Sequence, residues 1–277
     1  MMQNTETGPI GVFDSGYGGL TILREIRKLL PEYDCLYLGD NARAPYGSRS
    51  FDIIYDYTLS AVRYLFEHGC HLVILACNTA SAKALRTIQQ KWLPCNYPDR
   101  RVLGVIRPTV EIIRDLTHTG HIGVAGTTGT VASGSYSLEI KKLFPDMVVT
   151  EKACPLWVPL IENREYESEG TDFFVEKYLN ELFLQDPMID TLLLACTHYP
   201  ILLPKIRKFV PGNISIISQG TLVAESLKDY LKRHTEIDMR CGKNASAEFL
   251  TSENAEKFNE LASIFLNSDV RSRRISL

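Results

Sequence analysis

Two short segments of the sequence place a cysteine beside polar residues directly after an apolar run. The first is Cys77–Thr79, which follows Leu72–Ala76, and the second is Cys196–His198, which follows Thr191–Ala195. A thiolate is a good base or nucleophile once its pKa is lowered, and a helix N-terminus or a neighbouring histidine lowers it. The two segments therefore predict acid–base or nucleophilic chemistry by a pair of thiols.

On the residues alone, three other interpretations of these cysteines stay open. Both could be inert thiols that pack as small buried hydrophobic side chains. Cys77, Cys196 and His198 could bind zinc, although a fourth ligand at standard spacing is absent. One cysteine could instead be the nucleophile of a Cys–His hydrolase. The seven cysteines are scattered without a C-x-x-C pair, which indicates reduced cytosolic thiols rather than a zinc ribbon.

A glycine-rich segment, Asp14–Gly19, follows the apolar run Ile10–Phe13. Its glycines allow a tight turn and a close backbone approach, and the N–H groups of a following helix would face the loop. Thr21 stands where a dinucleotide-binding fingerprint needs its third glycine, so a substrate carboxylate is favoured over a nucleotide cofactor. The segment Asp40–Gly47 follows another apolar run and, taken alone, is typical of a structural turn.

Apolar runs alternate with helical patterns along most of the chain. Strands are predicted at residues 10–13, 35–38, 72–76, 102–106, 122–125, 147–150, 191–195 and 214–217. Helices are predicted at 20–30, 51–67, 79–91, 109–116, 131–144, 173–183, from 201, at 222–231 and at 255–266. This alternation predicts an α/β fold with mostly parallel sheets, in which ligands bind at the carboxyl ends of the strands.

Two features repeat in the same order at similar separations. Leu75–Thr79 resembles Leu194–His198, 119 residues later, and Ile10–Val12 resembles Ile122–Val124, 112 residues later. The repeat predicts two similar halves, each with a glycine-rich first turn and a later strand that ends in cysteine. If the halves face each other across a cleft, one ligand meets a cysteine from each side.

The composition excludes several other classes of protein. Of the 277 residues, 45% are hydrophobic and 23% charged, which excludes a collagenous, disordered or coiled-coil chain. The net charge of −3 gives no sign of the basic excess of a nucleic-acid-binding protein. No apolar run reaches the roughly 18 residues of a membrane span. The polar start, Met1–Pro9, does not resemble a secretory signal, so we expect a cytoplasmic protein without nucleic-acid or membrane partners.

Five motifs in order make the chain resemble the glutamate racemases of the aspartate/glutamate racemase superfamily. They are Asp14–Gly19, Pro45–Gly47, Ala76–Ser81, Gly104–Pro108 and Ala195–Pro200, within a resemblance that covers roughly residues 8–235. The resemblance implies an α/β fold of two similar lobes, with mostly parallel sheets flanked by helices and the active site in the cleft between them. It implies a first lobe at 1–105 plus 217–277, which carries Cys77, and a second lobe at 106–216, which carries Cys196.

The resemblance also implies a function and a set of site residues. The function is the interconversion of L- and D-glutamate without cofactor or metal, which supplies D-glutamate for peptidoglycan. Cys77 and Cys196 would be proton acceptor and donor on opposite faces of Cα, supported by Asp14, Glu162 and His198. The implied substrate-binding residues are Asp14, Ser15, Pro45, Tyr46, Gly47, Asn78, Thr79, Thr127, Thr130, Thr197 and His198.

Two of these positions have a different interpretation from the residues alone. Glu162 would then be a solvated helix or loop acid. An anionic Asp14 would raise the pKa of a nearby Cys77, so orienting a neighbour or holding the substrate ammonium suits it better. One segment, Ser218–Gly220, departs from the family pattern, which often has an acidic residue before Ser-Gly.

Inversion at Cα requires one thiol and one thiolate at the same time. A racemase of another acidic amino acid such as aspartate, a pyridoxal-phosphate racemase and a non-catalytic two-lobed amino-acid-binding protein remain alternatives. The expected partner is the small-molecule substrate, and a homodimer is compatible with the resemblance.

Overall fold

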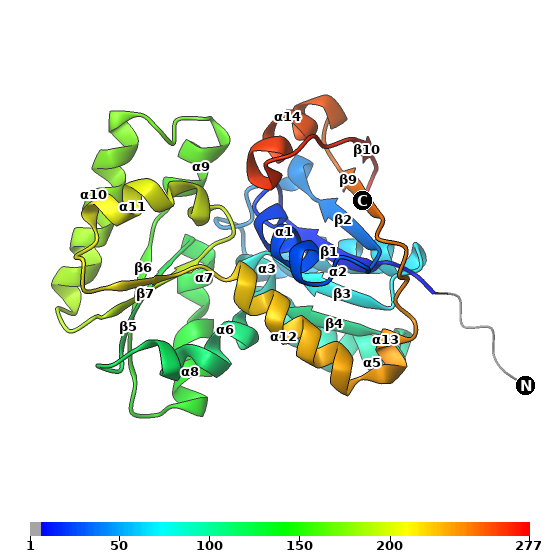
Figure 1. The fold of residues 1–277 in the computed structure, drawn as a ribbon, viewed down its shortest axis with the longest axis horizontal. Coiled ribbons are helices and arrows are strands. Elements are labelled where there is room, and N and C mark those ends of the chain that lie inside the picture. The colour runs from blue at the N-terminus through cyan, green and yellow to red at the C-terminus, as the bar shows by residue number, and fades with distance from the viewer. Residues whose placement is uncertain (1–6) are drawn as a thin grey trace, which may run out of the picture.

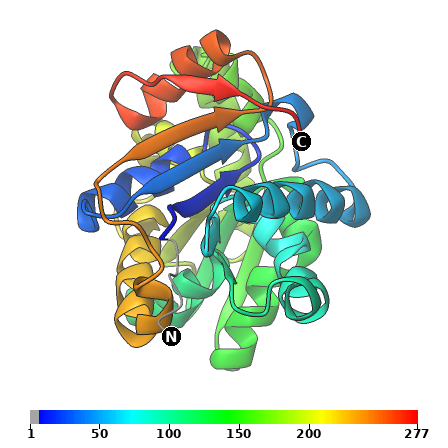
Figure 2. The same cartoon turned by 90° about the vertical axis from the view of Figure 1, so that its right-hand side faces the viewer.

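The computed structural model describes residues 7–277, which form two parallel β-sheets with helices against their faces (Figure 1). The strands of the first sheet are β1 (Ile10–Asp14), β2 (Cys35–Gly39), β3 (Leu72–Leu75), β4 (Arg101–Gly104), β9 (Ala247–Thr251) and β10 (Ser272–Arg274). Their order is β10-β9-β2-β1-β3-β4, and every neighbouring pair is parallel. Figure 2 shows this sheet from its outer side, with β9 and β10 in orange and red at one edge.

The second sheet repeats the arrangement of four strands of the first. Its strands are β5 (His121–Gly126), β6 (Val148–Ala153), β7 (Thr191–Ala195) and β8 (Ser215–Ile217), in the order β6-β5-β7-β8. This is the order of β2-β1-β3-β4, with β5 in the place of β1 and β7 in the place of β3. The predicted α/β fold with two similar halves is therefore confirmed at the level of strand order, and the two cysteine segments follow equivalent strands.

Helices of very different lengths connect the strands. The α-helices are α1 (Leu20–Leu29), α2 (Phe51–Glu67), α3 (Asn78–Lys83), α4 (Leu85–Thr87), α5 (Leu93–Asn96), α6 (Ile106–Ile112), α7 (Thr128–Ser133), α8 (Ser135–Leu143), α9 (Trp157–Glu162), α10 (Glu169–Gln185), α11 (Leu203–Phe209), α12 (Gly220–Arg233), α13 (Thr235–Asp238) and α14 (Ala255–Leu266). Short 3₁₀ turns lie at η1 (Asn41–Arg43), η3 (Ile113–Leu116) and η4 (Tyr199–Leu202), and η2 (Ile88–Trp92) is π-helical.

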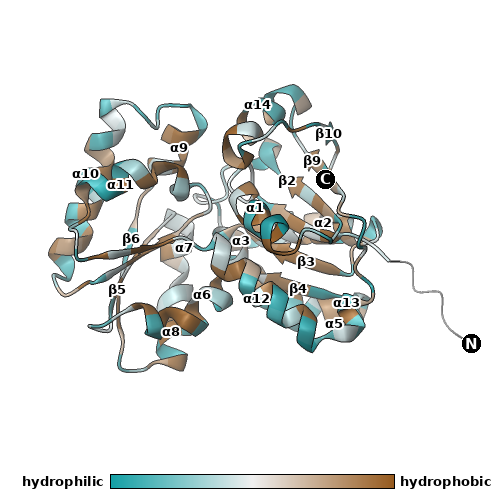
Figure 3. Ribbon diagram, viewed as in Figure 1, coloured by the Kyte–Doolittle hydropathy of each residue, from teal (hydrophilic) through white to brown (hydrophobic). Residues whose placement is uncertain are grey.

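Burial explains why the central strands are apolar along their whole length. Every residue of β1, β2, β3 and β7 is buried, as expected of parallel strands with helices on both faces. The strands β1 and β3 are largely brown in Figure 3, whereas α12 alternates between brown and teal. The helix α12 follows β8 of the second sheet and packs against α1, so the chain returns to the first sheet after residue 217.

All eight predicted strands are present, but β9 and β10 are not among the predictions. The strand β9 has no clear alternation of apolar and polar residues, and it pairs with β2 inside the sheet. The strand β10 includes Arg273 and Arg274, whose charges give no sign of a strand. Both arginines are exposed at the sheet edge, where charged side chains protect unpaired backbone groups.

Several predicted helices are interrupted, and the short helices α5, α9 and α13 lie outside the predictions. The predicted helix 79–91 is divided among α3, α4 and η2. The predicted helix 131–144 is divided into α7 and α8 at Gly134, whose φ of 60° is left-handed. The helix α9 was not predicted, and α10 begins four residues before its predicted start because Ser168 caps it by accepting a hydrogen bond from Thr171 N.

The lobe boundaries at 105/106 and 216/217 stay a prediction. The first sheet takes its strands from residues 10–104 and 247–274, and the second takes its strands from residues 121–217. The prediction that no secretory signal is present falls partly on residues 1–6, which lie outside the described residues. Within residues 7–277, no helix is long and apolar enough to cross a membrane.

Candidate active site

A cavity of about 230 Å³ contains both cysteine segments. Loops after strands of the first sheet form one side, and loops after strands of the second sheet form the other, so the carboxyl ends of both sheets face it. The lining residues are Ser15, Ala44, Pro45, Tyr46, Gly47, Ser48, Cys77, Asn78, Thr79, Thr127, Thr128, Cys154, Pro155, Val158, Pro159, Glu162, Cys196, Thr197 and His198. Every predicted site residue except Asp14 and Thr130 is therefore in this lining.

Cys77 lies between β3 and α3 and caps the helix. Its Sγ accepts a hydrogen bond from Ala80 N at 3.5 Å and lies 3.5 Å from Ser15 Oγ. Burial, together with the charges of Asp14 and Cys196, raises the pKa of the Cys77 thiol to about 12, although the hydrogen bonds with Ser15 and Ala80 lower it in part. Cys77 is therefore a protonated thiol at neutral pH.

Cys196 lies directly after β7 and has a different set of neighbours. Its Sγ is 3.9 Å from Nδ1 of His198, and Nε2 of the same ring is 2.9 Å from Oε1 of Glu162. Burial lowers the pKa of His198, but the hydrogen bonds and charges of Cys196 and Glu162 outweigh it, so the pKa is held well above its ordinary value. A charged His198 can donate one N–H to Glu162 and the other to a Cys196 thiolate.

The two thiols therefore differ in a way that suits proton transfer across a bound molecule. One is kept protonated by burial and by a nearby carboxyl group, and the other is paired with a histidine that favours its own charged form. Such a pair offers an acid and a base at once. Both cysteines are nearly enclosed, at 5% and 6% exposure, which limits exchange of their protons with water.

Asp14 lies behind the cavity rather than in its lining. The carboxyl group is fully buried, accepting hydrogen bonds from Gly16 N at 2.9 Å and from Thr197 Oγ1 at 3.3 Å. Burial raises the pKa of Asp14, while His198, Thr197 and the backbone N–H groups lower it in part. The observed contact links β1 of the first sheet to the loop after β7, so Asp14 orients Thr197, and its predicted roles in proton transfer and substrate binding stay predictions.

The glycine-rich loop serves the site through close packing. A Cβ at Gly18 would lie 2.3 Å from Thr197 Oγ1 and 2.4 Å from His198 Nδ1. Within Asp14–Gly19, Ser15 is the residue that lines the cavity, and no glycine of this loop has a positive φ. Gly18 is thus explained by the approach of the second sheet's loop, whereas a Cβ at Gly19 would meet Asp14 and Ala76. The structure does not place the backbone of these glycines in the cavity lining for a carboxylate.

Three threonine hydroxyls meet across the cavity. Thr79 Oγ1 of the first sheet's side lies 2.9 Å from Thr127 Oγ1 and 3.3 Å from Thr130 Oγ1, both on the side of the second sheet. Thr127 also caps α7 by accepting a hydrogen bond from Thr130 N. Thr130 is fully buried behind this contact and does not line the cavity, so its contact with the substrate stays a prediction.

The loop after β2 lines the cavity, but the hydroxyl of its Tyr46 is already hydrogen-bonded within the loop. Tyr46 donates its hydroxyl to Asp40 Oδ2 at 2.5 Å, and Arg43 Nε lies 2.6 Å from the same oxygen. These bonds fix the turn that places Pro45, Tyr46 and Gly47 in the lining. The interpretation of Asp40–Gly47 as only a structural turn is therefore incomplete.

Some lining residues were not predicted from the sequence. Cys154 is the clearest case: it follows β6, but the strand was predicted to end at Thr150, so the cysteine did not fall at a strand end. Extending the strand by three residues would have revealed it. The others are Ala44, Ser48, Thr128, Pro155, Val158 and Pro159.

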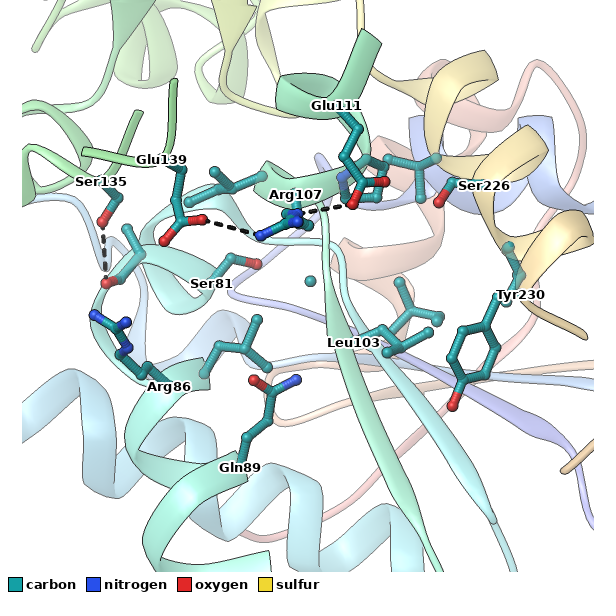
Figure 4. Close-up of a pocket in the computed structure, with 18 of the residues that line it drawn as sticks. Ser81, Arg86, Gln89, Leu103, Arg107, Glu111, Ser135, Glu139, Ser226 and Tyr230 are labelled. Atoms are coloured by element: carbon teal, nitrogen blue, oxygen red, sulfur yellow. Dashed lines mark hydrogen bonds and ion pairs between the residues drawn. The ribbon is translucent and has the colours of Figure 1, made fainter. Parts of the chain in front are cut away.

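A second cavity, of about 540 Å³, lies between β4, α6, α8 and α12. Arg107 occupies it and contacts Glu111 at 2.7 Å and Glu139 at 3.5 Å (Figure 4). Its lining includes neither cysteine nor histidine, so it lacks the acid–base groups of the smaller cavity. Within residues 7–277, no three His, Cys, Asp or Glu side chains are grouped to hold a metal ion.

Comparison with known proteins agrees with this arrangement. The Asp/Glu/Hydantoin racemase family matches residues 18–227, which is most of the chain. The chain belongs to this family. A glutamate racemase from Persephonella marina is 39% identical over 97% of both chains, and one from Streptococcus sanguinis is 38% identical over 97% of this chain and 98% of that protein.

Solved structures give the same result for the fold. A glutamate racemase from Bacillus anthracis has a TM-score of 0.88, 32% identity and 98% coverage of both chains. A glutamate racemase from Francisella tularensis, solved in complex with D-glutamate, has a TM-score of 0.86 and 30% identity at the same coverage. The protein is thus a racemase, an isomerase with the fold of the glutamate racemases.

The close packing at Gly18 leads to a testable prediction for this racemase. In Gly18→Ala the new Cβ would overlap His198 and Thr197, so the Cys196–His198 contact must change. Because a displacement of about 1 Å can cost roughly 100-fold in rate, we expect kcat to fall by about that factor. Gly212→Ala is the matched control, since no atom lies within 4 Å of its added Cβ. Native turnover of Gly18→Ala at native thermal stability would contradict this account.

Proposed function

We propose that this racemase interconverts L- and D-glutamate without a cofactor, and that Cys77 and Cys196 exchange protons with opposite faces of Cα. The observation that carries the proposal is the position of the two thiols. They follow equivalent strands, β3 and β7, of two sheets with the same strand order, and both line one cavity. The relatives named above are glutamate racemases, and one was solved with D-glutamate.

In the proposed reaction, one sulfur removes the Cα proton as a thiolate and the other delivers a proton as a thiol. In the free protein Cys77 is the thiol, because burial and Asp14 raise its pKa. The base suited to act with it is Cys196, whose Sγ lies 3.9 Å from the ring of His198, which Glu162 holds at 2.9 Å. After one turnover the protonation states of the two sulfurs are exchanged: the former thiolate is a thiol and the former thiol is a thiolate. The reverse reaction therefore uses the same pair in exchanged roles.

Binding of the substrate would rely on neutral donors. The lining contains neither Arg nor Lys, and the ring nitrogens of His198 face Cys196 and Glu162. The carboxylates of glutamate must therefore accept hydrogen bonds from hydroxyl, amide and backbone N–H groups. Ser15, Asn78, Thr79, Thr127 and Thr197 are the side chains in the lining that can donate them.

The direct test is to follow the optical signal of L-glutamate with the purified protein and no added cofactor. We expect the circular dichroism of L-glutamate to decay to zero as the racemate forms, and addition of pyridoxal phosphate to produce no aldimine absorption and no increase in rate. Polar donors left unpaired in the cavity penalise substrates without a side-chain carboxylate, so kcat/KM for glutamine and alanine should be lower by at least about 100-fold.

Three results would contradict the proposal. A comparable kcat/KM for alanine would exclude a site built for an acidic amino acid, and a higher value for aspartate would assign the chain another substrate. Binding of glutamate that survives Cys77→Ala and Cys196→Ala, with no racemisation by the native protein, would favour a non-catalytic binding protein. A supply of D-glutamate for peptidoglycan is an expectation from the resemblance, with which a homodimer is compatible, and a cytoplasmic location is an expectation from the sequence.

A further inference from the structure

Gln219 is a buried polar side chain at the junction between the two sheets. It lies between β8, the last strand of the second sheet, and α12, which packs on the first sheet. Its side chain is 3% exposed. The residue does not line the cavity of the two cysteines, and the sequence marks it only as part of Ser218–Gly220, where the chain departs from the family pattern.

Three side chains form a closed ring of hydrogen bonds around this residue. Asn78 Nδ2 donates to Gln219 Oε1 at 2.7 Å, and Gln219 Nε2 donates to Tyr136 OH at 2.7 Å. The hydroxyl of Tyr136 donates to Asn78 Oδ1 at 2.6 Å and closes the ring. All three side chains are buried, so an unpaired donor or acceptor among them would be costly.

The backbone determines the direction of this ring. Gln219 Nε2 also lies 3.2 Å from Val105 O and 2.9 Å from Thr109 Oγ1, so its two hydrogens are shared among these two acceptors and Tyr136 OH. A carbonyl can only accept, and Thr109 uses its own hydroxyl hydrogen to donate to the same Val105 O at 3.0 Å. The amide nitrogen of Gln219 must therefore face Val105, which leaves its oxygen for Asn78. Asn78 in turn must direct Nδ2 toward Gln219 and Oδ1 toward Tyr136.

This orientation matters because Asn78 follows Cys77 and lines the cavity. The ring uses the oxygen of Asn78 and one of its two Nδ2 hydrogens, so the group left for a ligand is an N–H donor. If the amide were reversed, an oxygen would face a substrate carboxylate and repel it. We propose that Gln219 is a positioning residue, which fixes Asn78 as a hydrogen-bond donor to a carboxylate of the amino-acid substrate.

The inference rests on the proposed function, because it assigns Asn78 a carboxylate ligand. It also predicts that Tyr136 acts in the same unit, since this hydroxyl connects Gln219 to Asn78. Residues of one ring are not additive when they are replaced together. A residue needed only for folding would change the stability of the protein, but it would leave the affinity of the folded protein unchanged.

The experiment measures glutamate affinity and turnover in Gln219→Met and Tyr136→Phe. Both substitutions keep the approximate shape of the side chain and break the ring. Loss of a hydrogen bond to a charged group predicts a roughly 10–100-fold rise in KM for glutamate with a smaller change in kcat. The double variant should bind glutamate no more weakly than the weaker-binding of the two single variants. Tyr33→Phe is the matched control, because it removes another buried tyrosine hydroxyl bond, to Asp238, away from the cavity.

Binding of D-glutamate, measured by calorimetry in chains that also carry Cys196→Ala, separates affinity from turnover. If this parent binds D-glutamate and the Gln219→Met and Tyr136→Phe derivatives bind equally well, the positioning role is overturned and the proposed function stands. If the parent does not bind glutamate, and the native protein does not racemise it, the proposed function fails. If Gln219→Met does not fold, Tyr136→Phe decides the matter, because it loses a single oxygen atom.

Discussion

Replacing either Cys77 or Cys196 with alanine is expected to abolish racemisation in both directions. In the proposed reaction each direction needs both sulfurs, one to remove a proton and one to deliver it, and both line one cavity. A positioned acid or base contributes roughly 10²–10⁴-fold, so each single variant should lose at least that factor in kcat/KM for both enantiomers. The measurement is the initial rate from L-glutamate and, separately, from D-glutamate.

Cys154→Ala is the matched control for these variants. Cys154 is a buried thiol in the same cavity, and burial also raises its pKa. Its sulfur, however, donates a hydrogen bond to the backbone carbonyl of Lys152 rather than contacting a histidine. It should retain most of the turnover. A Cys77 or Cys196 variant with near-native rate in either direction would exclude the two-thiol reaction.

The two thiols have different surroundings, as the proposed division of roles between them requires. Cys77 caps a helix next to a buried carboxyl group, whereas Cys196 faces a histidine that a glutamate holds in place. Glu162 contacts the ring of this histidine at 2.9 Å, although its own side chain is about a quarter exposed. The interpretation of Glu162 as a simply solvated acid is therefore wrong, while its role in proton transfer remains a proposal.

Much of the fold could be predicted from the sequence because the central strands are continuous apolar runs. The strands β1, β3 and β7 are buried along their whole length and β5 is buried apart from His121, so their apolar sequences leave little choice of assignment. Edge and late strands carry a weaker signal. The strand β10 consists of Ser272 and two arginines, and only its pairing with β9 makes it a strand. Helices such as α9, with Pro159 in the middle of six residues, also lack a clear pattern.

The site was predictable where function depends on the end of a strand, and not where it depends on contacts between distant loops. Cys77 and Cys196 follow apolar runs, so the parallel sheet itself brings them to one edge. The contact of Asp14 with Thr197 spans 183 positions, and that of Gln219 with Asn78 spans 141. No local spacing encodes such contacts, because they depend on how the two sheets face each other.

Racemisation in heavy water should place deuterium at Cα of the product and leave the recovered substrate almost free of it. The thiol that protonates the intermediate has exchanged with solvent before the substrate binds, so it delivers deuterium. The other sulfur takes the substrate proton, and both cysteines are about 5% exposed, so this proton is shielded while the site is closed. Return of the intermediate to the starting enantiomer therefore restores the original hydrogen.

The measurement is mass spectrometry of both enantiomers, separated after a brief reaction that starts from L-glutamate. We expect early D-glutamate to carry one deuterium per molecule at Cα and the recovered L-glutamate to carry almost none. Starting from D-glutamate should give the mirror result, because the same two sulfurs act in exchanged roles. A single base that moves between the faces would carry the original hydrogen into the product. Substantial protium at Cα of early D-glutamate would therefore show that one group serves both faces, which the separate positions of Cys77 and Cys196 do not allow.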